Sequence, residues 1–267
     1  MTWTGTELLL VTERLSALAL LLQSVEWLQV RGVFADDGVW RYALLAPEQR
    51  RLPLGLSLLC RVSLPYPSFV ALLGLRCVAA ALALFLGESR VWPFLCLSQV
   101  LLCVRFRGAS NGGSDSMSVV LASALSVPAL LGHTPFAIQA ALLYIGVQVT
   151  LSYVLAGLAK LRQPDWRNGR ALRHFVLGSP YGMPRVVHRL LGRSGLAATL
   201  GWAVVGFECL FPLAWLDPRV CLGWLACGAL FHAANVLALG LNRFFWVWLA
   251  GYPATLAGSE LVHVLSG

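Results

Sequence analysis

Residues 152–172 read SYVLAGLAKLRQPDWRNGRAL, an apolar helical stretch that gives way to a polar turn and then to arginines. Lys160, at this boundary, is the single lysine among the 20 Lys and Arg residues of the chain. A lysine amine can lose its proton where its surroundings favour that, whereas a guanidinium stays charged. Lys160 is therefore the first candidate for acid–base chemistry. The structural alternative is a helix-end lysine whose amine reaches the membrane interface.

The composition predicts a helical membrane protein. Of the 267 residues, 58% are hydrophobic and 12% are charged, and the mean hydropathy is +0.73. A membrane helix needs about 20 apolar residues, and about eight stretches approach that length. We expect an all-α polytopic bundle of about eight transmembrane helices plus interfacial helices. It should form a single domain over residues 1–267 and lie in the cell membrane as a multi-pass protein.

The expected spans follow the apolar runs. They are residues 7–29, 68–86, 91–104, 116–131, 136–161, 196–216, 220–239 and 244–262. Residues 54–64 are too few to cross and should lie in the interface or re-enter the membrane. The amphipathic residues 166–176 should lie on the membrane surface. Trp246, Trp248 and Tyr252 are possible interface anchors of the last span.

The arginines flank the spans, mostly on one side, which the positive-inside rule places in the cytoplasm. With a formal net charge of +8, this pattern favours anionic membrane lipid as a partner over nucleic acid. Alternatively, some of these arginines bind an anionic substrate, and the positive-inside rule then gives the wrong orientation of the chain in the membrane.

The sequence predicts no metal site. Seven cysteines lie in or beside apolar segments, without a CxxC pair or a Cys/His cluster at metal spacing. They are interpreted as small core residues. Internal repeats of 20 to 50 residues are also not found, which argues against a repeat transporter.

Ionisable residues inside the expected spans mark candidate polar sites. Arg76 lies near the middle of its span and needs a carboxylate, backbone carbonyls or water, and we expect Glu208 to be its partner. Such a pair would fix the register of two helices. His232 and Asn235 are three residues apart, so they share a helix face and can point at one site.

Three elements, in order, resemble the HTTM (horizontally transferred transmembrane domain) family, whose best-known member is the vitamin K-dependent gamma-glutamyl carboxylase. They are the turn NGGSD at residues 111–115, YVLAGLAKLRQPDW at residues 153–166 followed by Gly169, and FHAAN at residues 231–235. The resemblance extends over most of the chain from about Ser68 onward.

The resemblance implies a vitamin K-dependent gamma-carboxylase-like enzyme, a lyase that modifies a peptide or small molecule. Its cofactor would be reduced vitamin K or menaquinone, whose oxygenation gives a base that removes a proton from glutamate before carbon dioxide adds. Lys160 would be the base toward the hydroquinone, and His232 would be the second catalytic residue. The resemblance and the polar spans together give these candidate binding residues: Asn111, Ser114, Asp115, Asp165, Trp166, Asn235, Arg76 and Glu208.

The residues around Lys160 agree with the role of a base. An amine accepts a proton only after losing its own, and burial and neighbouring positive charge both favour that loss. An apolar helix precedes Lys160, and four arginines follow it at positions 162, 167, 170 and 173. His232 with Asn235 could hold a quinone oxygen or a carboxylate by hydrogen bonds in a dry site.

Two departures argue against gamma-carboxylation of long protein substrates, and a second hypothesis comes from another functional class. Gly113 stands where the carboxylase has a histidine, and the large soluble region that binds the carboxylase propeptide has no counterpart in these 267 residues. The alternative is a non-catalytic maturation or assembly factor for a secreted peptide, working with a partner protein subunit. Lys160, Arg76, Glu208 and His232 would then form a structural polar network.

Overall fold

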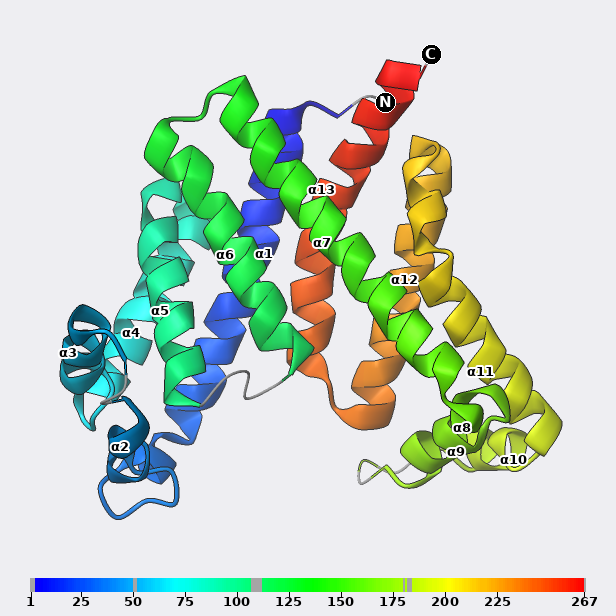
Figure 1. The fold of residues 1–267 in the computed structure, drawn as a ribbon, viewed down its shortest axis with the longest axis horizontal. Coiled ribbons are helices and arrows are strands. Elements are labelled where there is room, and N and C mark those ends of the chain that lie inside the picture. Colours follow the sequence, from blue (N-terminus) through cyan, green and yellow to red (C-terminus); the bar gives the residue numbers. More distant parts are fainter. Residues whose placement is uncertain (1–2, 50–51, 107–111, 180, 182–183, 267) are drawn as a thin grey trace. The chain divides into compact units, whose positions relative to one another are not determined.

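The computed structural model describes residues 3–49, 52–106, 112–179, 181 and 184–266. All regular secondary structure in these ranges is helical, which confirms the all-α prediction (Figure 1). Residue contacts group the chain into two compact units. Residues 9–141 are here called the N-unit, and residues 142–267 with residues 1–8 are called the C-unit. The expected single domain stays a prediction.

The N-unit is built on four longer helices joined by short helical turns, with α5 packed along α6 and α4 (Figure 1). Its elements are α1 (Gly5–Gln29), η1 (Arg31–Phe34), η2 (Tyr42–Leu44), α2 (Ala46–Gln49), α3 (Leu54–Ser63), α4 (Ser68–Ala81), the π-helical turn η3 (Leu82–Leu86), η4 (Ser89–Val91), α5 (Trp92–Arg105), α6 (Gly113–Leu131) and the start of α7 (Pro135–Arg162). Gly87, in the left-handed region at φ 67°, ends the segment that begins with α4.

The C-unit contains the first residues of α1, the remainder of α7 and the helices after it. These are α8 (Pro164–Arg167), α9 (Arg170–Leu177), α10 (Arg185–Leu191), α11 (Ser194–Cys209), η5 (Phe211–Trp215), α12 (Pro218–Leu239) and α13 (Asn242–Ser266). The Asp217 carboxylate caps α12 by accepting hydrogen bonds from the backbone amides of Arg219 and Val220, at 2.7 and 3.4 Å. Gly240, at φ 67°, ends α12 and lets α13 turn back along it.

Within the described residues, five helical segments are long and apolar enough to cross a membrane, and they make the chain a multi-pass helical membrane protein. They are Gly5–Gln29, Ser68–Leu86, Gly113–Leu131, Pro135–Arg162 and Pro218–Leu239, and the pair Arg185–Leu191 and Gly195–Cys209, bent by 91°, would be a sixth if it crosses as one span. At 14 residues, α5 is shorter than the roughly 20 that a straight span needs. The count of about eight stays a prediction.

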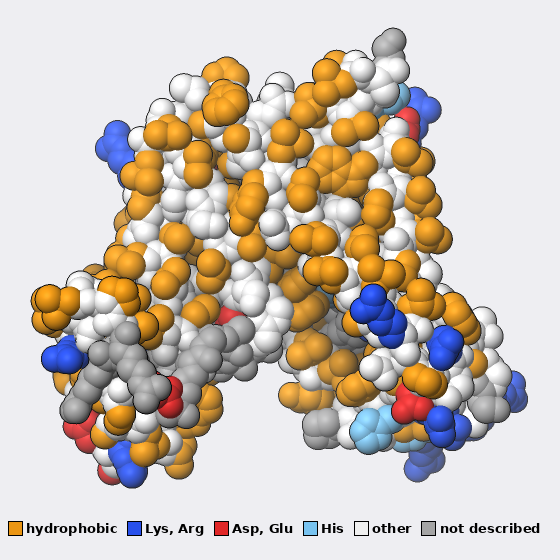
Figure 2. All heavy atoms as spheres, viewed as in Figure 1, with side chains coloured by type: hydrophobic (Ala, Val, Ile, Leu, Met, Phe, Trp, Pro, Cys, Tyr) orange, Lys and Arg blue, Asp and Glu red, His pale blue; other side chains and the backbone are white. Residues whose placement is uncertain are grey.

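The outer faces of the helices are apolar, as contact with lipid requires. Leu54, Phe136 and Leu230 are each more than two-thirds exposed. Figure 2 shows hydrophobic side chains over the helices of both units, whereas Lys and Arg side chains gather over α8–α10. Charged residues therefore concentrate beside the apolar helices rather than along them.

Gly157 marks a close approach between α7 and α11. A Cβ added there would lie 2.7 Å from the Cys209 backbone nitrogen and 2.9 Å from the Glu208 Cβ, whereas a Cβ on Gly206 would meet open space. Only glycine therefore lets the two helices come this close, and their approach places Glu208 opposite Lys160.

We expect Gly157→Ala to lower the free energy of unfolding by about 1–3 kcal/mol, because the added methyl forces α7 and α11 apart. The matched variant Gly206→Ala should leave stability unchanged or raise it by up to about 1 kcal/mol, since alanine favours a helix interior. Unfolding by SDS in mixed micelles, followed by circular dichroism, measures both variants. Equal stability of the two would contradict the close approach.

Candidate functional site

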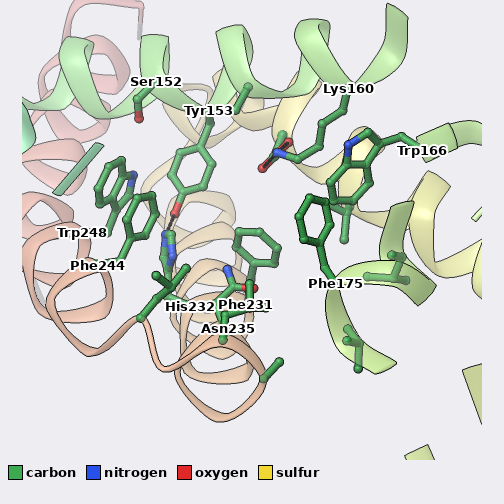
Figure 3. A pocket seen from close by; sticks show the side chains of 18 residues that line it. Ser152, Tyr153, Lys160, Trp166, Phe175, Phe231, His232, Asn235, Phe244 and Trp248 are labelled. Atoms are coloured by element: carbon green, nitrogen blue, oxygen red, sulfur yellow. Dashed lines mark hydrogen bonds and ion pairs between the residues drawn. The ribbon is translucent and has the colours of Figure 1, made fainter. Parts of the chain in front are cut away.

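A pocket of about 270 Å³ lies in the C-unit between helices α7, α8, α9, α11, α12 and α13 (Figure 3). Most of its wall is apolar, and five of the lining side chains are Trp or Phe: Trp166, Phe175, Phe231, Phe244 and Trp248. Six polar or ionisable side chains interrupt the apolar wall: Ser152, Tyr153, Lys160, Glu208, His232 and Asn235. An apolar pocket with a few converging polar groups is the usual form of a small-molecule site.

One end of the pocket holds an amine–carboxylate pair. The Lys160 Nζ donates hydrogen bonds to both carboxylate oxygens of Glu208, each at 2.6 Å. The Glu208 side chain is 3% exposed and that of Lys160 is 19% exposed, so the pair is largely withdrawn from solvent. The Trp166 ring lies over the amine, with its centroid 5.2 Å from Nζ, a cation–π distance.

This pair corrects two expectations from the sequence. The expected partner of Glu208 was Arg76, but Lys160 binds both of its oxygens. The expected surroundings of Lys160 were positive, but the group in contact with its amine is a carboxylate, while Arg162 and Arg167 are exposed on the surface. A hydrogen-bonded carboxylate favours the charged form of an amine, which is the opposite of what positive neighbours would do.

A second polar group is a chain of three side chains. The Tyr153 hydroxyl lies 2.6 Å from His232 Nε2 and 2.7 Å from the Tyr252 hydroxyl, so it bridges the two. The other imidazole nitrogen, His232 Nδ1, is buried without a hydrogen-bond partner. Gly228 makes room for this chain, because a Cβ there would overlap the Tyr252 hydroxyl.

Aromatic rings fix the orientation of both Tyr153 and His232. Tyr153 stacks on Phe211 with ring centroids 4.1 Å apart and planes 19° apart. The rings of Phe244 and Trp248 stack on each other at 3.9 Å and lie 5.3 and 5.5 Å from the imidazole (Figure 3). Stacked rings hold their neighbours in few rotamers, so the imidazole has a defined direction.

The pocket unites most of the candidates from the second half of the chain. Lys160, Trp166, Glu208, His232 and Asn235 all line it. The shared face predicted for His232 and Asn235 is confirmed. Asp165 is not among the lining residues: its side chain is 61% exposed and forms a surface ion pair with Arg170 at 3.0 Å.

The candidates from the first half of the chain belong to the N-unit instead. Arg76 is fully buried, and its guanidinium donates to Ser24, Ser98, Gln23 and Gln99. The Gln23 amide in turn donates to Asp115 Oδ1 at 2.7 Å. Ser114 is buried beside Asp115 on α6, and Asn111 lies outside the described residues.

Two residues of the site were not identified from the sequence. Tyr153 precedes Lys160 by seven residues, two turns of α7, and that spacing puts both on one helix face. Tyr252 was interpreted as an interface anchor but is 5% exposed and bonded to Tyr153. Trp248, the other expected anchor on the same face of α13, lines the pocket. The seven-residue spacing from Lys160 was enough to place Tyr153 at the site from the sequence. The contact of Tyr252 depends on how α13 packs against α7, which the sequence does not display.

Comparison with family models, with curated proteins and with solved structures found no match to this chain. The described residues contain no group of three or more His, Cys, Asp or Glu side chains placed to hold a metal ion. The functional assignment therefore depends on the pocket itself.

Proposed function

We propose that this protein is an HTTM-type enzyme of the cell membrane that resembles the vitamin K-dependent gamma-carboxylase. It would use a reduced quinone to modify a peptide or small molecule. The observation that carries the proposal is the pocket itself, which holds a largely buried amine–carboxylate pair and a phenol–imidazole–phenol chain within aromatic walls.

The lining residues fit a quinone ring. A naphthoquinone is flat and apolar with two oxygens, and the pocket offers stacked aromatic walls and a volume near the lower end of the usual range of about 300–1,000 Å³. His232 Nδ1, buried without a partner, is a hydrogen-bonding group for a quinone oxygen. When bound, the reduced quinone would supply, through its reaction with oxygen, a base strength that no side chain has.

Lys160 and Glu208 would together accept the proton of the quinol hydroxyl. In contact at 2.6 Å, the two groups can move a proton from the amine to the carboxylate, which gives a neutral amine beside a carboxylic acid. Withdrawal from water lowers the cost of this transfer, because the neutral pair has no desolvated charges. The neutral amine is then the base.

His232 and Tyr153 would orient the ligand. If the Tyr153 hydroxyl donates to His232 Nε2, the neutral imidazole carries its proton on Nδ1. That N–H is then a fixed donor in a site of low dielectric, where such donors stabilise developing negative charge most strongly.

A maturation or assembly factor is the second candidate. It is favoured by the way the polar clusters are satisfied internally: Glu208 is bound by Lys160, and every nitrogen of Arg76 has an acceptor. A polar network whose hydrogen bonds are all made internally is what a purely structural role, the fixing of helix packing, requires. Purification distinguishes the two: a co-purified quinone favours the enzyme, and a stoichiometric partner subunit without ligand favours the factor.

A pocket-filling substitution tests the proposal. Ala156 lines the pocket, whereas Ala159, on the same helix, is exposed and is not among the lining residues. We expect Ala156→Phe to weaken binding of radiolabelled menadione at least tenfold, and Ala159→Phe to leave it unchanged, by equilibrium binding to the purified protein. If both variants bind menadione as the unmodified protein does, the quinone site lies elsewhere.

A further inference from the structure

The N-unit contains two fully buried arginines whose surroundings differ. All three side-chain nitrogens of Arg76 have hydrogen-bond acceptors, from α1 and α5. Arg105, the last residue of α5, donates from Nη2 to the backbone carbonyl of Trp40, but its Nε and Nη1 have no partner. The hydrogen bonds of Arg76 are therefore complete, whereas two nitrogens of Arg105 remain as unused donors.

The groups in contact with the Arg105 guanidinium are neutral. The guanidinium lies 5.7 and 5.3 Å from the ring centroids of Phe34 and Phe69, and no carboxylate of the described residues forms an ion pair with it. Cation–π contacts and one carbonyl offset only part of the cost of withdrawing a charge from water. A guanidinium has five N–H donors, and oxyanions are their strongest acceptors.

Arg105 lines a cavity of about 230 Å³ in the N-unit. The cavity lies between the end of α5 and residues 39–45, which follow η1 and include η2. Arg41 is a second cation in its wall, and the described lining residues include no acidic side chain. Trp40, Leu44 and Phe106 supply apolar walls. Trp40 and Leu44 are nearly half exposed, so the apolar wall continues to the surface.

We propose that this cavity binds an amphiphilic anion, with a carboxylate or phosphate group on Arg105 and an apolar part against Trp40, Leu44 and Phe106. The charge of the ligand follows from the two cations and the unpaired donors, and its apolar body follows from the remaining wall. The ligand is either an anionic lipid of the membrane or a soluble amphiphile. This site is separate from the quinone pocket and does not depend on it.

The test uses the full chain in a neutral maltoside detergent and dodecyl phosphate as the probe, with heats of binding measured by calorimetry. We expect Arg105→Gln to weaken binding at least about tenfold, because charge-assisted hydrogen bonds to the phosphate are lost. Arg31→Gln removes an exposed positive charge of the same unit outside the cavity and should change binding less than twofold.

A second variant keeps the test valid if Arg105→Gln fails to fold. Val39 is 73% exposed and lines the cavity, so Val39→Glu should fold normally while placing a carboxylate beside the guanidinium. It should weaken dodecyl phosphate binding at least about tenfold through repulsion and competition for Arg105. Val39→Gln, which adds the same bulk without charge, should retain binding.

The source of the ligand is distinguished by two further measurements. For a membrane lipid, native mass spectrometry of the unmodified protein shows one retained anionic phospholipid that Val39→Glu loses. For a soluble ligand, inorganic phosphate competes with dodecyl phosphate. Either result supports the site. The proposal is overturned if dodecyl phosphate does not bind the folded protein, or if it binds Val39→Glu as tightly as the unmodified chain.

Discussion

Lys160→Arg is expected to abolish quinol-dependent turnover while leaving the fold intact. Arginine keeps the positive charge and can bind both Glu208 oxygens, so the ion pair survives. It does not release its proton near neutral pH, so it cannot act as a base. Loss of a general base typically costs a factor of about 10² to 10⁴ in rate. We therefore expect oxygen uptake with a reduced naphthoquinone to fall at least about 100-fold.

The matched control is Arg162→Lys, on the same helix two residues further on, where the side chain is exposed. This variant should consume oxygen at the rate of the unmodified protein. Circular dichroism and gel filtration report whether each variant keeps its fold. Full turnover by a folded Lys160→Arg protein would end the assignment of Lys160 as the base.

Lys160→Met should destabilise the protein by about 3–5 kcal/mol, because it leaves the Glu208 carboxylate buried without a partner. The double variant Lys160→Met with Glu208→Leu should recover most of that loss, since it removes both charges and fills the space with apolar atoms. Unfolding in SDS micelles measures all three variants. A double variant as unstable as the single one would show that the ion pair is not the cause.

The positions of the helices could be read from the sequence because Pro and Gly bound the apolar runs. Residues 54–64 were expected as a short apolar segment that does not span, and they form the helix Leu54–Ser63, directly after Pro53. Residues 220–239 form Pro218–Leu239, between the Asp217 cap and Gly240. Each boundary depends on local backbone chemistry, which a sequence displays.

The partners of the buried charges could not be read in the same way. His232 and Asn235 lie in one helix, so their spacing of three residues was enough to predict a common site. Lys160 and Glu208 lie 48 residues apart, and their contact requires α7 and α11 to approach at Gly157. Several interhelical partners were available to Glu208 from composition alone, and packing selected Lys160 rather than Arg76.

The central claim is that Lys160 and His232 face one dry chamber that accepts a quinone ring. The most direct measurement is an experimental structure of the purified protein in lipid nanodiscs with menadione. The account predicts ring density between the Lys160–Glu208 pair and the His232 imidazole, against Phe244 and Trp248. An amine directed into solvent or lipid headgroups, away from the imidazole and with menadione bound elsewhere, would contradict it.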